Sequence, residues 1–129
     1  IDPDIAARAC DVTENLAQSV DLQGVLTLEL FVTKSGEILA NEIAPRTHNS
    51  GHWSIDACAH SQFENHVRAV CGLPVVSPAR HSDCDMINIL GQDMERIPGY
   101  RETKGACLHL YNKGEAKIDR KMGHVTILK

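Results

Sequence analysis

Alternation of apolar and polar positions predicts a helix and a hairpin at the start of the chain. Apolar residues recur at helical spacing over residues 4–19, and Asp2 stands where a helix N-cap is expected. Residues 25–33 alternate as a half-buried strand, and residues 38–43 form the return strand. Ser35-Gly36 lies between the two strands and is typical of a turn. The first part of the chain is therefore predicted to be a helix followed by an antiparallel hairpin.

The remaining pattern predicts one more helix and then a β-rich segment. Residues 45–54 form a polar loop, and Ser61 with Glu64 matches a capping box that opens a helix ending at Cys71. Short strands separated by glycines follow Pro74, at residues 86–90, 106–111 and 124–128. We expect an α+β protein with one domain over residues 1–74 and a small β-rich domain over residues 75–129.

Composition narrows the class of protein. Thirteen Lys and Arg against 17 Asp and Glu give a net charge of −4, which disfavours nucleic acid and membrane surfaces as partners. No apolar run approaches the roughly 20 residues that a membrane span needs. The chain has five cysteines without C-x-x-C spacing, a usage typical of a reducing, cytoplasmic compartment. Because Ile1 replaces a methionine and little follows the last strand, we expect part of a longer protein.

Two glutamates of the hairpin are predicted to face each other. If Ser35-Gly36 is a two-residue turn, Lys34 pairs with Glu37, and this register places Glu29 directly opposite Glu42. Like charges at such a cross-strand position are destabilising. A shared divalent cation would offset the repulsion, and Mg²⁺ prefers a few carboxylates together with phosphate oxygens. The alternative is a pair of glutamates on a solvated face.

Two further polar segments are candidates for binding. Residues 41–53 read NEIAPRTHNSGHW and place Arg46, a side chain suited to planar anions, in a loop with several other polar groups, namely His48, Asn49, Ser50 and His52. An ordinary polar turn is the alternative, although binding residues concentrate on loops held by rigid elements. Arg120 and Lys121 precede the last predicted strand; on their own they are more typical of a solvated cation pair.

Taken together, these segments resemble the N5-carboxyaminoimidazole ribonucleotide synthetase family of ATP-grasp enzymes. The likeness rests on NEIAPRTHNSGHW and on shorter matches at residues 29–33 (ELFVT), 61–64 (SQFE), 86–91 (MINILG) and 120–124 (RKMGH). It implies the C-terminal part of an ATP-grasp domain, followed by a small β-rich domain of the rudiment single hybrid type that is truncated at its end. The implied reaction phosphorylates bicarbonate with ATP and transfers the carboxyl group to 5-aminoimidazole ribonucleotide, releasing ADP and phosphate.

The resemblance also implies roles for particular residues. Glu29 and Glu42 would bind Mg²⁺, and Asn41 with Glu42 would line the ATP site. Arg46, His48 and His52 would be catalytic. The ribonucleotide and bicarbonate would be bound by Arg46, His48, Asn49 and Ser50, and the ribonucleotide phosphate by Arg120 and Lys121. The full-length enzyme would be a cytoplasmic homodimer.

The sequence departs from the family in several respects. Thr47 stands where the family usually has proline, which affects loop stiffness more than chemistry. The family also needs an N-terminal α/β domain and a lid over the nucleotide, and we expect neither of them within this polypeptide. We therefore expect the polypeptide alone to be inactive.

Three alternatives remain at this point. The first is a formate-dependent glycinamide ribonucleotide transformylase, which usually has Asp-Thr-Gly-Met where this chain has residues 49–52, Asn-Ser-Gly-His. The second is a non-catalytic nucleotide-binding remnant. The third is a zinc-binding interaction domain that uses His48, His52 and cysteines.

Overall fold

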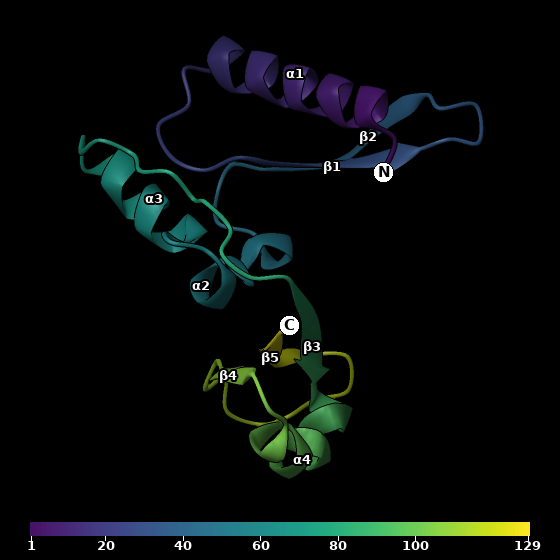
Figure 1. The fold of residues 1–129 in the computed structure, drawn as a ribbon, viewed down its shortest axis with the longest axis vertical. Coiled ribbons are helices and arrows are strands. Elements are labelled where there is room, and N and C mark those ends of the chain that lie inside the picture. Colours follow the sequence, from purple (N-terminus) through teal and green to yellow (C-terminus); the bar gives the residue numbers. More distant parts are fainter. The chain divides into compact units, whose positions relative to one another are not determined.

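The computed structural model describes residues 1–129 and has the predicted α+β composition (Figure 1). Contacts divide the chain into two compact units. The first unit consists of Ile1–Gly51 and Gln62–Val76, and the second of His52–Ser61 and Ser77–Lys129. The second unit thus includes a short segment from the first half of the sequence. The domain boundary expected at residue 74 stays a prediction.

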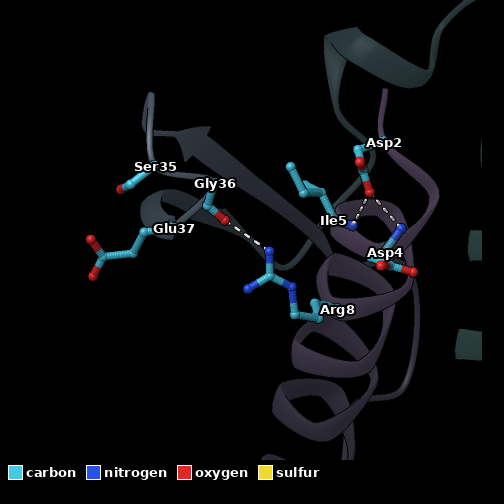
Figure 2. Close-up of a pocket in the computed structure, with 7 residues that line it drawn as sticks. All are labelled: Asp2, Asp4, Ile5, Arg8, Ser35, Gly36 and Glu37. Atoms are coloured by element: carbon cyan, nitrogen blue, oxygen red, sulfur yellow. Dashed lines mark hydrogen bonds between the residues drawn. The ribbon is translucent and has the colours of Figure 1, made fainter.

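In the first unit, helix α1 (Pro3–Ser19) lies along a hairpin of β1 (Thr27–Val32) and β2 (Ile38–Ala44) (Figure 1). The Asp2 carboxylate caps the helix by accepting from the Asp4 N–H at 2.8 Å, as the sequence predicts. Figure 2 shows how Arg8 joins helix and hairpin, since its Nη2 donates to the carbonyl of Gly36 at 2.8 Å. The position of the hairpin against α1 is therefore fixed at its turn.

The two-residue turn predicted for this hairpin is wrong. Thr33 N–H donates to the Glu37 carbonyl at 2.9 Å, so the turn consists of Lys34, Ser35 and Gly36, and Lys34 does not pair with Glu37. Gly36 has a φ of +80°, a conformation that favours glycine. The longer turn on its own would move every later pair by one residue.

A β-bulge restores the predicted register at the glutamates. The pairing shifts between Glu29 and Leu30, so that Leu30 pairs with Ala40 while Glu29 pairs with Glu42. Asn41 is the extra residue of β2 at this shift. The prediction that Glu29 lies opposite Glu42 is therefore confirmed, although the turn from which it was derived is different. Helix α3 (Gln62–Val70) completes the first unit.

The second unit is a three-stranded antiparallel sheet in the order β3-β5-β4. Its strands are β3 (Cys84–Leu90), β4 (Ala106–Leu110) and β5 (Lys121–Leu128), of which β5 begins at Lys121 rather than at the predicted His124. The core of this unit is formed by Ile89, Ile97 and Val125. The short helices α2 (Ser54–Ala57) and α4 (Ile97–Glu102) are not predicted by the sequence pattern, since each is too brief to show a helical period. No helix of the structure has the length and apolar content needed to cross a membrane.

Candidate functional site

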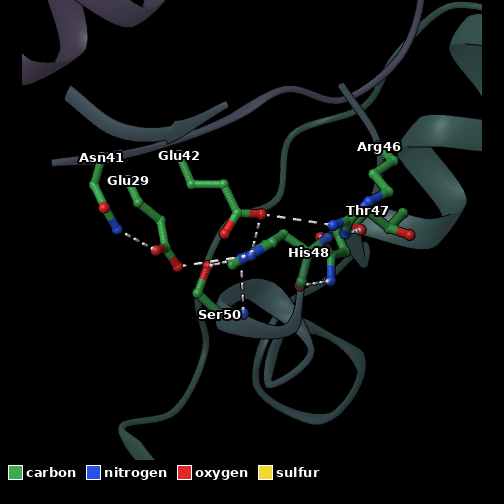
Figure 3. Close-up of polar contacts among 8 residues, drawn as sticks. Glu29, Asn41, Glu42, Arg46, Thr47, His48 and Ser50 are labelled. Atoms are coloured by element: carbon green, nitrogen blue, oxygen red, sulfur yellow. Dashed lines mark hydrogen bonds and ion pairs between the residues drawn. The ribbon is translucent and has the colours of Figure 1, made fainter. Parts of the chain in front are cut away.

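The first unit gathers a polar cluster around the two facing glutamates (Figure 3). Glu29 extends from β1 and Glu42 from β2, with side chains 39% and 48% exposed. Asn41, the bulged residue, donates from Nδ2 to Glu29 Oε2 at 3.2 Å. In a regular strand, neighbouring side chains point to opposite faces. The bulge interrupts that alternation, and it allows Asn41 to contact the Glu29 carboxylate although Glu42 is its neighbour in β2.

His48 lies against both carboxylates. Its Nε2 is 3.6 Å from Glu29 Oε1 and 3.8 Å from Glu42 Oε1, and its side chain is only 12% exposed. Its other ring nitrogen, Nδ1, accepts from the Ser50 backbone N–H at 3.3 Å and lies 2.9 Å from the Ser50 hydroxyl. Because a backbone N–H can only donate, Nδ1 has the lone pair, and the ring proton is on Nε2, which faces the glutamates. His48 thus presents a donor to the space between two carboxylates.

Arg46 adds a full positive charge at the edge of this cluster. Its Nη2 is 3.6 Å from Glu42 Oε1, and its side chain is 61% exposed. An ion pair this exposed contributes little to stability. The guanidinium is therefore available to an anionic ligand, which it can bind with two parallel hydrogen bonds. Asn49 and Ser50 lie in the adjoining single turn of 3₁₀ helix, Asn49–Gly51.

The donor set of this cluster fits Mg²⁺. Glu29 and Glu42 supply hard carboxylate oxygens from directly opposed strand positions, and both side chains are open to solvent. Two carboxylates leave most of an octahedral shell to be completed by phosphate or water oxygens, which is how Mg²⁺ is usually bound. The structure thus brings together six of the residues that the sequence singled out: Glu29, Asn41, Glu42, Arg46, His48 and Ser50.

Of the other predicted site residues, Asn49 lies in the first unit, and His52, Arg120 and Lys121 belong to the second. His52 packs edge-on against Tyr111, with ring centroids 6.1 Å apart, and lies 5.4 Å from the ring of His124. Arg120 and Lys121 are exposed at the start of β5, where Arg120 Nη1 donates to the Glu115 carbonyl at 3.5 Å. Arg120 and Lys121 are therefore accessible to a ligand, whereas His52 is half-buried.

A partly buried network in the second unit is not predicted by the sequence pattern. The Asp56 carboxylate hydrogen-bonds His109 Nε2 at 2.9 and 3.1 Å, and the rings of His109 and His124 stack with centroids 4.6 Å apart. Tyr111 shares a 2.7 Å hydrogen bond with His124 Nδ1. Burial, followed by the nearby His109 and His52, lowers the pKa of His124 from 6.5 to about 4, and Asp56 opposes the shift. His109 and Tyr111 alternate along their strand segment, and this is the only local sequence signal of the network. Asp56 lies on α2, far from them in the sequence, so no short motif contains all the partners.

The stacking argues against a metal at this network. Ligand atoms of Asp56, His109 and His124 lie within 4.8 Å of one another. Yet the two imidazole rings are nearly parallel, at 16°. The lone pair of an imidazole nitrogen lies in the plane of its ring, so two stacked rings do not direct their lone pairs at one ion. We therefore interpret these residues as a hydrogen-bonded network that joins α2 to the sheet.

Comparison with known protein families identifies the class first. Residues 1–63 match the ATP-grasp domain, the class to which the hairpin and its paired glutamates belong. Residues 84–129 match the phosphoribosylaminoimidazole carboxylase C-terminal domain. The order of these two domains, with the relatives below, shows that the chain belongs to the N5-carboxyaminoimidazole ribonucleotide synthetase family, to whose C-terminal region it corresponds.

Individual relatives agree with this assignment. The N5-carboxyaminoimidazole ribonucleotide synthase of Brucella melitensis is 55% identical over 124 residues, which cover 96% of this chain and 34% of that protein. A crystal structure of the synthetase as its ADP complex superposes with a TM-score of 0.93 at 45% identity, covering 100% of this chain and 34% of that one. The Aspergillus clavatus synthase, solved with ADP and 5-aminoimidazole ribonucleotide, has a TM-score of 0.92 at 34% identity and covers 100% and 36%. The chain thus spans about a third of the length of these relatives.

Proposed function

We propose that the protein containing this chain carboxylates 5-aminoimidazole ribonucleotide, using ATP and bicarbonate, in purine biosynthesis. The observation that supports this most directly is the opposition of Glu29 and Glu42 beside Arg46 and His48. Paired carboxylates and a largely exposed guanidinium suit a reaction in which phosphate charge must be neutralised and a small planar anion held. The names of the relatives indicate the same reaction.

Glu29 and Glu42 would hold Mg²⁺, and Asn41 with Glu42 would line the ATP site. When bound, Mg²⁺ neutralises negative charge on the phosphates and on the transferred phosphoryl group. The residues themselves are arranged to accept a cation. His48 Nε2 already places a proton between the two carboxylates, and Asn41 orients Glu29. Arg46 and His48 are the polar groups that hold the acidic pair in position before ligands bind.

Arg46, His48, Asn49 and Ser50 would bind bicarbonate and the ribonucleotide. Bicarbonate is planar, and the exposed fork of Arg46 matches two of its oxygens. His48 and His52 would serve as catalytic side chains, because neutral imidazole can accept a proton near pH 7. Arg120 and Lys121 would bind the ribonucleotide phosphate from the second unit. We also propose that the full-length enzyme is a cytoplasmic homodimer.

The test is turnover by the full-length protein that carries this chain. ADP release should require bicarbonate and 5-aminoimidazole ribonucleotide together, and Glu42→Gln should lower it at least ~100-fold, more than the loss typical of residues that only support a metal ligand. Glu64→Gln is the matched control, because Glu64 is 39% exposed against 48% for Glu42, and it is likewise paired with an arginine, Arg68 on α3, at 2.8 Å. ADP release that depends on formate and glycinamide ribonucleotide instead would refute the proposal.

A further inference from the structure

One side chain of α3 is bound to the backbone of the residue that faces the glutamates. Gln62 Oε1 accepts from the His48 N–H at 3.0 Å, and Gln62 Nε2 donates to the His48 carbonyl at 2.7 Å. Both hydrogen bonds are partly buried. A side-chain amide that pairs with both the donor and the acceptor of one residue restricts that residue in translation and in rotation. We propose that Gln62 is a positioning residue that sets the place of the His48 imidazole between Glu29 and Glu42.

A glycine makes this contact possible. A Cβ built on Gly51 would lie 2.9 Å from Oε1 and 3.0 Å from Cδ of Gln62. Real Cβ atoms avoid such distances, so the amide lies flat against the turn only because residue 51 has no side chain. The Gly51 N–H also donates to the His48 carbonyl at 3.0 Å, and that carbonyl therefore accepts two hydrogen bonds. The turn from His48 to Gly51 is thus restrained by its own backbone hydrogen bond and by the two hydrogen bonds to the Gln62 side chain.

The helix that carries Gln62 is itself tied to the strand that carries Glu29. His66, one turn further along α3, accepts from the Val25 N–H through Nδ1 at 3.3 Å, and Val25 lies just before β1. A Cβ on Gly24 would lie 2.9 Å from that nitrogen, so this contact too needs a glycine. Residues four apart share one face of a helix. One face of α3 thus contacts both the backbone of His48 and the segment that leads into the strand of Glu29.

This geometry matters because the glutamates and Arg46 are exposed and have few other restraints. A displacement of about 1 Å at a reacting group can cost ~100-fold in rate. We expect Gln62 to act on turnover through His48, because its amide pairs with both the N–H and the carbonyl of that residue. The kinetic part of this inference rests on the proposed function, whereas the position of the imidazole does not.

The experiment compares two variants that remove equivalent hydrogen bonds. Gln62→Met keeps the volume of the side chain and removes both bonds to His48. Asn65→Leu does the same to the control pair, because Asn65 on the same helix accepts from the Val76 N–H at 2.8 Å and donates to its carbonyl at 2.9 Å. In the full-length protein, both variants should lower the melting temperature by similar amounts. Gln62→Met should lower kcat ~10- to 100-fold, and Asn65→Leu should change it less than about threefold.

A double variant distinguishes positioning from general destabilisation. If Gln62 acts through His48, then His48→Ala with Gln62→Met should be no slower than His48→Ala alone, because the effects of coupled residues are not additive. The proposal would be overturned if the loss of kcat in the double variant equalled the product of the two single losses. It would also be overturned if Gln62→Met were as active as the unaltered protein.

A spectroscopic measurement separates this inference from the proposed function. Nitrogen-15 spectra of the histidine rings report which ring nitrogen has the proton. His48 in the unaltered protein and in Asn65→Leu should show the Nε2–H tautomer, as its contact with the Ser50 N–H requires. Gln62→Met should show a mixture of tautomers. That result supports positioning even if the unaltered protein shows no carboxylating turnover, and an unchanged tautomer in Gln62→Met refutes it.

Discussion

Acid should weaken the second unit through one buried histidine. His124 is 1% exposed, lies on β5 and shares its Nδ1 with the Tyr111 hydroxyl at 2.7 Å. Burial, together with the nearby His109 and His52, lowers its pKa from 6.5 to about 4, while Asp56 opposes the shift. The folded protein therefore keeps this imidazole neutral at pH values where the unfolded chain would protonate it.

The size and sign of the effect follow from this difference in pKa. Because the folded pKa is the lower one, the unfolded state binds more protons between about pH 4 and pH 6.5, and stability must fall as the pH falls through that window. At roughly 1.4 kcal/mol per pH unit, the difference between the two pKa values gives an upper value of about 3 kcal/mol. Above pH 6.5 the contribution of His124 should be constant.

Urea unfolding at a series of pH values measures this contribution when two variants accompany the unaltered protein. His124→Asn keeps a polar partner for Tyr111 and cannot titrate, so the free energy of unfolding of the unaltered protein should fall relative to it by up to about 3 kcal/mol from pH 7 to pH 4. Thr126→Val, a change at the buried residue two positions further along β5 on the same face, should change the free energy of unfolding equally at every pH. A constant difference between the unaltered protein and His124→Asn would refute the assignment, as would a directly titrated His124 pKa near 6.5.

Three further predictions concern individual side chains. Glu42→Gln should raise the free energy of unfolding without metal by up to about 1 kcal/mol, because it removes a like charge from a cross-strand pair, and it should abolish stabilisation by Mg²⁺ in a melting experiment. Gly51→Ala should lower the free energy of unfolding by about 1–3 kcal/mol, because the new Cβ would lie 2.9 Å from Oε1 of the Gln62 amide. Gly99→Ala should instead stabilise α4 by about 0.5–1 kcal/mol, because nothing lies within 4 Å of its Cβ; equal effects of the two alanines on urea midpoints would contradict the packing argument. Iodoacetamide at pH 8, followed by peptide mass spectrometry, should modify exposed Cys10 well before Cys107, where burial and then the neighbouring Asp56 raise the thiol pKa.

Much of the first unit could be predicted because its signals are local. The Asp2 cap and the following helix can be recognised from a few adjacent residues, and the structure has both. The alternation of β1 places Glu29 on the face opposite Leu28 and Leu30, which line the pocket against α1. The crowded loop after Glu42 can also be recognised directly, because its residue types are unusual in an ordinary turn. Each of these features depends on neighbours within one element.

The register illustrates how a correct expectation can come from two compensating differences. The turn is longer than its dipeptide suggests, and the bulge at Asn41 shifts the pairing back before Glu29 is reached. A bulge depends on how the whole hairpin twists and packs against α1, so no short sequence pattern specifies it. The bulge brings the Asn41 amide into contact with Glu29, and only the folded structure shows this contact.

The sequence by itself determined the longer helices and the strands, the acidic pair and the family to which the chain belongs, because periodicity and short motifs indicate all three. Only the tertiary structure decided that Gln62 binds the His48 backbone, and that Asp56, His109 and His124 form one partly buried network. The reason is physical: such contacts join elements far apart in the chain, and their geometry depends on the packing of several elements at once. Periodicity shows which face of an element is buried, but not which distant polar group it meets there.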